Sequence, residues 1–293
     1  SAFEAQLALS QLAQSQVQAA LVLSTLEMET RHGQLPGPDL AVIAYGSLGA
    51  RALGFDSDLD LVFLYLPASA LSDGARPIPA ERYHTGVARR LLSLLSATTP
   101  SGRLYSIDAR LRPNGRAGLL VSSVDAFRRY QLEEAWIWEL QALTRARPIA
   151  GSAETADSFT TARHHVLTTP RDKARVKQEV PAMRQRIRAE HAEGAPLKHG
   201  PGGLLDIEFV VQLGLLLNAS SYPEVIGSTE ISQQLRALQT CGWINANIFN
   251  TLDNAYTQLV HARQQTALID DRAEVKTTPL LSIAQALCDE ILG

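Results

Sequence analysis

The chain has 293 residues, of which 45% are hydrophobic and 19% charged, and its formal net charge is -3. This length allows two domains or one large domain with a buried core, and the near-neutral charge gives no reason to expect a nucleic acid as partner. No apolar run reaches the roughly 18 residues that span a bilayer, and the two cysteines lack metal-ligand spacing, so we expect a cytoplasmic protein without a membrane segment.

Residues 1–31 contain no glycine or proline and predict an amphipathic helix. Its apolar stripe is expected to consist of residues at spacings of three and four or their multiples, namely Leu9, Leu12, Ala19, Leu23 and Leu26. Because the chain begins at Ser1 and enters this helix at once, we expect it to be part of a longer polypeptide.

Three strands and a helix are predicted next. Residues 40–45 and 59–66 are short apolar runs typical of buried strands, and residues 81–95 have a helical pattern. In residues 103–112 apolar side chains alternate with polar ones, which predicts a third strand with Asp108, Arg110 and Arg112 on one face.

Strand signals almost vanish after residue 123, and the remaining patterns are helical. Helices are expected over 125–147, 172–193 (with a kink or break at Pro181), 204–219, 229–240, 246–269 and 279–291. The fold class is therefore α+β, with a small mixed β-sheet flanked by helices and followed by an all-α helical bundle. We expect a boundary near residue 168, which gives domains 1–168 and 169–293.

The chemistry is concentrated in the segment AYGSLGARALGFDSDLDLVFLY, residues 44–65. Gly46 and Ser47 are followed, after ten residues, by Asp58 and Asp60, and two acids at alternate strand positions point to the same face. Such carboxylates suit a hard cation such as Mg²⁺, and Asp108 would be the third ligand if its strand is a neighbour. A trio of this kind can hold two metal ions about 4 Å apart.

The turn at Gly46 and Ser47 is expected to bind phosphate groups through backbone N–H groups and a hydroxyl. Arg110 and Arg112 are candidates for the same phosphates, with surface ion pairs as the alternative. Gly-Ser, about ten residues, Asp-x-Asp and a later strand aspartate together are typical of the nucleotidyltransferase superfamily. That superfamily transfers a nucleotidyl group by in-line attack of a hydroxyl on the α-phosphate.

Four segments make a closer resemblance: GSLGARALGFDSDLDLVFLY, GRLYSIDARLRPNGRAGLLVSS, YQLEEAWIWELQALTRARPIAG and KHGPGGLLDIEFVVQ. They occur in the order found in the bacterial glutamine synthetase adenylyltransferase family, which the chain resembles from residue 1 through the helical region. That family has two homologous halves, of which the N-terminal one removes AMP by phosphorolysis and the C-terminal one adds it. The words AWxWExQALTRARP and GPGGLLDIEF resemble the C-terminal, adenylylating half.

This resemblance implies a nucleotidyltransferase fold that uses Mg²⁺ and transfers AMP from ATP to a glutamine synthetase tyrosine, which down-regulates nitrogen assimilation. It also implies a link to the PII signal protein through the full-length enzyme. By position, the catalytic metal ligands are Asp58, Asp60 and Asp108, and the phosphate turn is Gly46 and Ser47. The chain departs from the family pattern by having Ser47, Ala50, Ala52 and Leu140 in place of lysine, glycine, glutamate and histidine.

The remaining motifs have less specific interpretations. Trp136 and Trp138 could frame an adenine or an acceptor tyrosine, but core positions are expected. The run 200–203 lacks a Walker lysine and is interpreted as a helix start that closes over the active site, with at most one of Asp206 and Glu208 facing the cleft. Three alternatives stay open: the phosphorolytic removing half, a catalytically silent docking module, and a uridylyltransferase that acts on PII.

Overall fold

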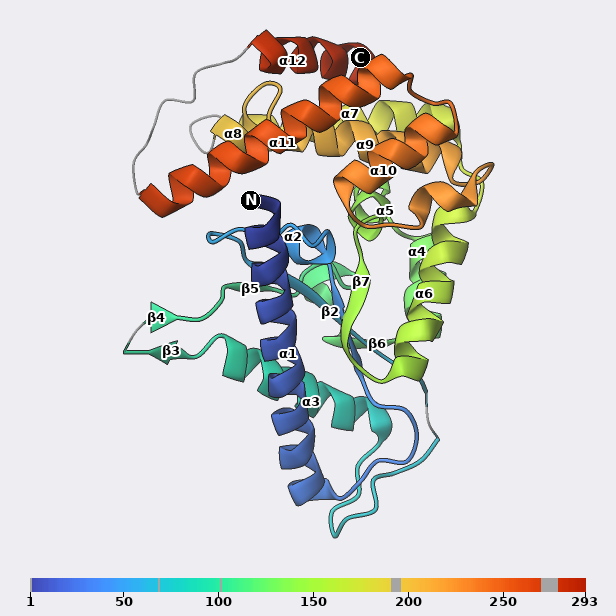
Figure 1. The fold of residues 1–293 in the computed structure, drawn as a ribbon. Helices are drawn as coiled ribbons and strands as arrows, with labels where there is room; N and C mark the ends of the chain where they lie inside the picture. The colour runs from blue at the N-terminus through green and yellow to red at the C-terminus, as the bar shows by residue number, and fades with distance from the viewer. Residues whose placement is uncertain (1, 68, 101, 191–195, 270–278) are drawn as a thin grey trace.

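The computed structural model describes residues 2–67, 69–100, 102–190, 196–269 and 279–293, and it combines a small sheet with many helices (Figure 1). The strands are β1 Ala41–Ala44, β2 Leu59–Tyr65, β3 Thr98–Thr99, β4 Gly102–Arg103, β5 Ile107–Asp108, β6 Val121–Ser123 and β7 Arg147–Gly151. The helices of the N-terminal part are α1 Ala2–His32, α2 Gly46–Gly49, α3 Ala80–Leu95, η1 Gly115–Ala117, α4 Val124–Glu133, α5 Ile137–Leu143 and α6 Ala153–Thr168. The C-terminal part contains α7 Lys173–Glu190, α8 Pro196–His199, α9 Leu204–Asn218, η2 Pro223–Ile226, α10 Ile231–Thr240, α11 Ala246–Ile269 and α12 Pro279–Leu292. The α+β class is confirmed.

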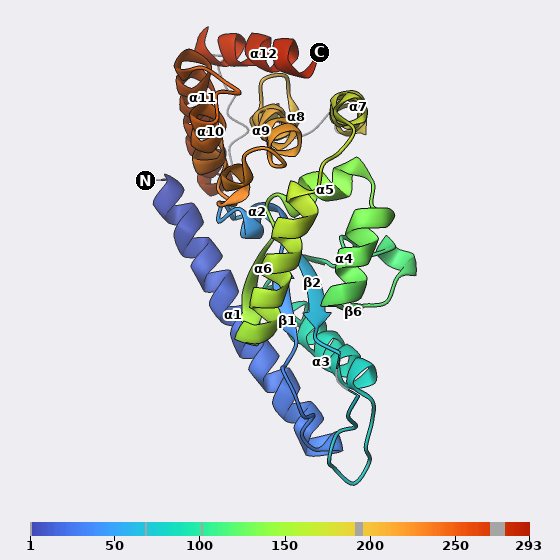
Figure 2. The same cartoon turned by 90° about the vertical axis from the view of Figure 1, so that its right-hand side faces the viewer.

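The main sheet is mixed, as expected from the sequence. Strand β1 pairs antiparallel with β2 and with β7, and β2 pairs in parallel with β5 near its start and with β6 near its end. Helices cover both faces of this sheet (Figure 2). Val42 and Phe63 pack toward α1 and α3, whereas Ile43 and Leu64 pack toward α4 and α6. Because both faces are buried, β1 and most of β2 are continuous apolar runs.

The first helix forms as predicted, but its buried face is not the predicted one. Leu12, Leu23 and Leu26 are 52%, 57% and 52% exposed, while the buried face of α1 carries smaller side chains such as Ala13 and Val17. Apolar residues occur at helical spacing on both sides of α1, so periodicity alone could not select the side. The smaller side chains allow α1 to lie close to α3 and β7.

Of the predicted strand over residues 103–112, only Arg103 at the end of β4 and the two residues of β5 are in strands. After Asp108 the backbone turns, because the Asp108 carboxylate accepts a hydrogen bond from the Arg110 N–H at 2.8 Å and Arg112 donates to the carbonyl of Ala109 at 2.5 Å. These local side-chain to backbone bonds replace the sheet ladder. Alternating polarity therefore indicated one strand where the segment has three paired residues in two separate short strands.

The predicted helix over residues 125–147 is also divided. Helix α4 ends at Glu133, and α5 starts anew where the Glu139 carboxylate accepts the Trp136 N–H at 2.9 Å. The chain then forms β7, a strand that was not predicted because it is short and contains Pro148 and Gly151. Proline is tolerated there because β7 lies at the edge of the sheet. At Pro181 a kink or a break was predicted; α7 continues through this residue, so a break is wrong, and the kink stays a prediction.

Helix α9 lies at the centre of the C-terminal helices and contacts α7, α10, α11 and α12. The stretch 197–218 is long and apolar enough to cross a membrane by length and composition, but 83% of its most apolar window is buried inside the protein. Its apolar character follows from this central position, because almost every side of α9 is covered by another helix.

Candidate active site

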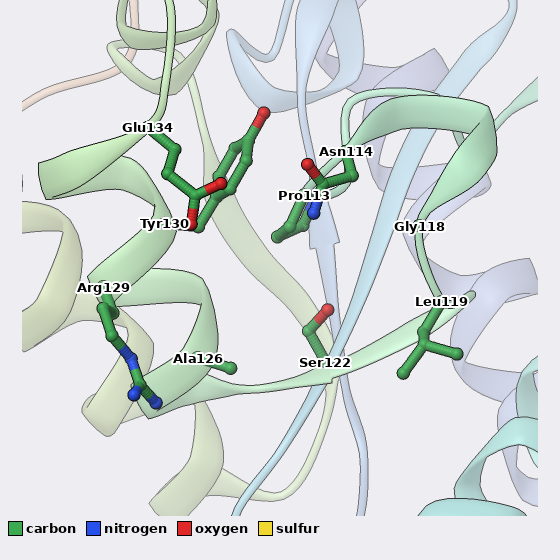
Figure 3. A pocket seen from close by; sticks show the side chains of 9 residues that line it. All are labelled: Pro113, Asn114, Gly118, Leu119, Ser122, Ala126, Arg129, Tyr130 and Glu134. Carbon is green, nitrogen blue, oxygen red and sulfur yellow. The ribbon is translucent and has the colours of Figure 1, made fainter.

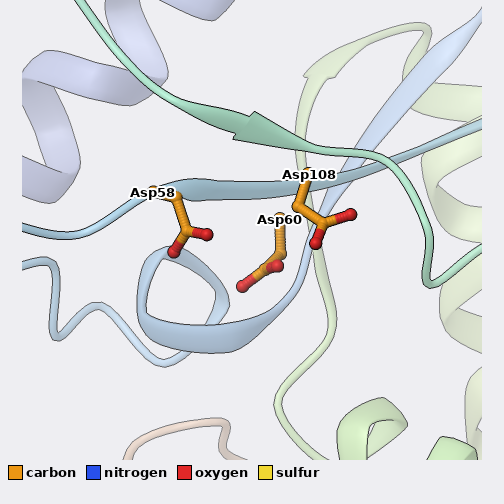
Figure 4. Close-up of side chains that lie close together, drawn as sticks. All are labelled: Asp58, Asp60 and Asp108. Carbon is orange, nitrogen blue, oxygen red and sulfur yellow. The ribbon is translucent and has the colours of Figure 1, made fainter. Parts of the chain in front are cut away.

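The three predicted aspartates lie together at the start of β2. The parallel register of β2 and β5 places Asp60 opposite Asp108, and Asp58 precedes Asp60 by two residues on the same side of the chain. Figure 4 shows the three side chains pointing the same way, and their nearest ligand oxygens lie within 4.8 Å of one another. Asp58 is exposed, whereas Asp60 and Asp108 are half-buried. One water-accessible carboxylate and two partly shielded ones thus share one small volume.

The surroundings shift the pKa values of Asp60 and Asp108 in opposite directions. Burial, and then the charges of Asp58 and Asp108, raise the pKa of Asp60 to about 7, although the charges of Arg145 and Lys198 lower it. Hydrogen bonds from Arg110 hold the pKa of Asp108 below its usual value. A divalent cation would relieve the repulsion among three carboxylates, so the donor set fits Mg²⁺.

The glycine of the predicted phosphate turn lies directly against Asp60. Gly46 has φ +55, and a Cβ at this position would come 2.1 Å from Oδ2 of Asp60. The backbone N–H of Tyr45 donates to the carbonyl of Asp60 at 2.9 Å, which fixes the turn beside the carboxylates. A Cβ would collide with the carboxylate, so this close approach requires glycine, which also adopts a positive φ without strain. Ser47, the second residue of α2, has a half-buried side chain.

The two predicted phosphate-binding arginines differ in their positions. Arg110 lies at the carboxylate cluster, where its Nε donates to Oδ2 of Asp108 at 2.6 Å. Arg112 instead donates to the carbonyls of Ala109, Gly118 and Arg116, and so stabilises the loop 109–118. The structure therefore brings Arg110 to the aspartates and directs Arg112 into the loop.

Two further cations near Asp60 were not identified from the sequence. Arg145 pairs with Glu208 of α9 at 2.8 Å, with side chains only 15% and 18% exposed, and Lys198 belongs to α8. Both act on the Asp60 carboxylate. Both lie in segments that resemble the family, Arg145 in TRARP and Lys198 in KHGPGG, so the resemblance could have identified them as site residues.

The acids after the glycine-rich run have separate roles. Asp206 is fully buried and accepts hydrogen bonds from Arg184, Arg188 and the N–H of Gly202, so it holds the start of α9. Glu208 reaches Arg145 instead. The substitutions relative to the family pattern at Ala50 and Leu140 lie in the core, where each residue is 4% exposed.

Two cavities lie beside the carboxylates and the loop after them. One of about 520 Å³ opens next to Asp58 and has Leu53, Phe55 and Tyr105 in its wall. Another of about 360 Å³ lies between α4 and the loop that follows Arg112, with Tyr130 and Glu134 on the α4 side (Figure 3).

The tryptophans are not core residues, so that expectation is wrong. Trp136 is 61% exposed and Trp138 is 38% exposed. Both lie where the chain enters α5, after the turn that separates it from α4. Exposed tryptophans are uncommon on a free surface and are enriched in binding interfaces.

Comparisons with known proteins show which families the chain is similar to. The family model described as glutamate-ammonia ligase adenylyltransferase matches residues 3–162, and that of GlnD PII-uridylyltransferase matches residues 173–280. The chain is 42% identical over 284 residues to a bifunctional glutamine synthetase adenylyltransferase/adenylyl-removing enzyme of Xanthomonas campestris pv. campestris (strain B100), covering 94% of the chain and 30% of the relative.

Relatives with the same name are found in Methylococcus capsulatus and Chromobacterium violaceum. The first is 40% identical over 85% of the chain and 28% of the relative, and the second is 41% identical over 95% of the chain and 30% of the relative. The chain thus spans about 30% of the length of the curated relatives it matches. The first family model alone matches more than half of the chain. The chain belongs to the glutamate-ammonia ligase adenylyltransferase family.

Proposed function

We propose that the chain is an adenylyltransferase that moves AMP from ATP to a tyrosine hydroxyl of glutamine synthetase, by two-metal in-line attack on the α-phosphate with pyrophosphate as leaving group. The observation that carries this proposal is the convergence of Asp58, Asp60 and Asp108 within 4.8 Å beside the Gly46 turn. Family membership and the names of the relatives support the same reaction class.

Each residue has a role in this proposal. Asp58, Asp60 and Asp108 would hold Mg²⁺, whose chemistry would be to lower the pKa of the attacking hydroxyl and neutralise phosphate charge. Gly46 and Ser47 would bind phosphate oxygens, and Arg110 would contact the triphosphate from the side of Asp108. The cavity beside Asp58 would receive the nucleoside between Leu53, Phe55 and Tyr105. Catalysis would then depend on positioning and charge neutralisation.

The organisation of the chain is part of the proposal. We place the boundary between a catalytic domain, residues 1–168, and a helical bundle, residues 169–293, in the connection between α6 and α7. The enzyme would act in the cytoplasm, where its protein substrate is made, and PII would influence it through a longer polypeptide of the kind the relatives represent.

The direct test is incubation of the chain with Mg²⁺, ATP and unmodified glutamine synthetase, followed by mass spectrometry of the acceptor. The expected result is the added mass of one AMP on a tyrosine, absent when EDTA replaces Mg²⁺. An unmodified acceptor in the presence of Mg²⁺ would refute the proposal.

Two other activities have specific support and the same assay separates them. The relatives' names include an adenylyl-removing activity, which would appear as phosphate-dependent release of ADP from adenylylated glutamine synthetase. The match of residues 173–280 to a PII-uridylyltransferase model favours a test with UTP and PII, in which transfer of UMP would identify that activity.

A further inference from the structure

A cavity of about 340 Å³ lies between β7, α6 and the start of α10, and none of the three aspartates lines it. Three arginines do: Arg51 just after α2, Arg147 of β7 and Arg163 of α6. Thr160, Ser228 and Thr229 also line it, beside the apolar side chains of Ala146 and Phe159. Three of the four charged residues in the wall of this cavity are therefore cationic.

The positive charge is not balanced. Arg163 is only 8% exposed and donates to the carbonyls of Leu143, Thr144 and Ile226. Arg147 donates to the carbonyls of Leu48 and Gly49 and to the side-chain amide oxygen of Gln14. Within the part of the chain that the structure describes, neither guanidinium has a carboxylate within ion-pair distance.

One acid, Glu230, lies among the residues that line the cavity, and its carboxylate is 3.8 Å from Nε of Arg51. Burial lowers the pKa of Arg147 and of Arg163 to about 10, so both remain charged at neutral pH. Three cations thus face one carboxylate. Buried charges are normally paired, and the imbalance calls for an anion.

The backbone also favours an anion here. Helix α10 begins at Ile231 without a side-chain cap from Glu230, and its first turn borders the cavity. Free N–H groups at a helix start attract negative charge. Arg51 adopts φ +56, a left-handed conformation that is uncommon for arginine, and its side chain lines the same cavity.

We propose that this cavity is a binding site for a small oxyanion, a metabolite that carries a phosphate or carboxylate group, distinct from the adenylyl-transfer site. Guanidinium groups recognise both kinds of oxyanion through paired N–H donors. The volume of the cavity is at the lower end of the range for small-molecule sites, so it favours a compact ligand over a whole nucleotide.

The site is connected to the carboxylate cluster through α2. Arg147 at 3.1 Å and the hydroxyl of Thr229 at 2.8 Å both donate to the carbonyl of Gly49, at one end of α2, while Gly46 at the other end touches Asp60. An anion that draws Arg147 toward itself would alter the support of the predicted phosphate turn. Binding at the two sites would then be coupled, and the coupling would be reciprocal.

The test is a binding measurement that needs no catalysis, so its failure is distinguishable from failure of the proposed function. Thermal unfolding of the chain in EDTA is followed during titration with inorganic phosphate, with succinate, and with chloride at equal ionic strength. Saturable stabilisation by phosphate or by succinate beyond chloride is expected, and it identifies the preferred oxyanion. No advantage of either over chloride would overturn the proposal.

Variants locate the bound anion. Arg51→Glu should weaken binding at least tenfold, and Arg51→Lys should retain most of it because the charge is kept. Gln233→Glu, which adds a carboxylate to the cavity without touching the arginines, serves if Arg51→Glu does not fold, and it should also weaken binding. Arg82→Glu, at an exposed position of α3 outside the cavity, is the matched control and should bind normally.

Arg110→Gln distinguishes the two sites, since Arg110 lies at the carboxylate cluster. Retained anion binding in Arg110→Gln, together with loss in Arg51→Glu, supports the proposal. Loss in Arg110→Gln with normal binding in Arg51→Glu would place the anion at the transfer site and would overturn it.

Discussion

The Asp60→Asn substitution should stabilise the metal-free protein and abolish AMP transfer. The surroundings raise the pKa of Asp60 from 3.8 to about 7, so ionisation of this group costs more in the folded chain than in the unfolded chain. At one pKa unit per 1.36 kcal/mol, asparagine should raise the free energy of unfolding by about 2 kcal/mol at pH 5.5 and about 4 kcal/mol at pH 8. The gain grows between pH 3.8 and about 7, because there the carboxylate is ionised in the unfolded chain but still largely protonated in the folded chain, and it levels off above the folded pKa. Loss of transfer is expected because a metal ligand is removed.

The assay is urea denaturation in EDTA at both pH values, with transfer to glutamine synthetase measured in parallel. Asp125→Asn is the matched control, because the Asp125 side chain is 70% exposed and should change the free energy of unfolding by less than about 0.5 kcal/mol. The reasoning fails if Asp60→Asn lowers stability, if its gain is the same at both pH values, or if the purified variant keeps full activity.

Three further outcomes are expected. Mg²⁺ should raise the melting temperature of the native chain but not of Asp60→Asn, and an equal rise in both would place the metal elsewhere. Burial lowers the pKa of His84 to about 4, so this residue should cost up to about 3 kcal/mol of stability as pH drops from 6.5 toward 4, because only the unfolded state takes up the proton. In urea titrations His84→Gln should therefore gain stability relative to the native chain by about that amount over this pH range, and an unchanged difference would contradict the assignment. Val17→Lys should cost more than about 3 kcal/mol and Leu12→Lys less than about 1 in the same titrations, and similar costs would contradict the assignment of the buried face.

The carboxylate cluster could be predicted because it depends on short-range geometry. Alternate strand positions share a face, so Asp58 and Asp60 had to point the same way, and two runs of strand type made Asp108 a natural third member. What the sequence left open was whether the two strands are neighbours; in the structure they pair in parallel, with Asp60 opposite Asp108. The glycine of the turn was also predictable, and the structure adds that its missing Cβ is what admits the Asp60 carboxylate.

The sequence did not predict features that depend on contacts between segments far apart in the chain or on local hydrogen bonds. Helix α1 has apolar residues on two sides, and only its partners α3 and β7 determine which side is buried. The segment around Trp136 has helical composition, yet the Glu139 carboxylate starts a new helix there and leaves the tryptophan exposed. Strand β7 exists because the edge of β1 is available to pair with it, even though its own five residues have weak strand character.

The cations of the site show why the two parts of the chain act together. Lys198 and the Arg145 partner Glu208 come from beyond the expected boundary at residue 168, yet Lys198 and Arg145 both influence the ionisation of Asp60. Thr229, from the same helical part, holds the carbonyl of Gly49 at the end of the predicted phosphate turn. The boundary expected from the sequence therefore divides a mixed α/β part from a helical part, but residues from both parts lie around Asp60 and the Gly46 turn. Asp58 and Asp60 are two residues apart, whereas Arg145 and Lys198 lie far along the chain from them, so a sequence pattern identifies the two acids first and only the folded chain shows that these two cations act on Asp60.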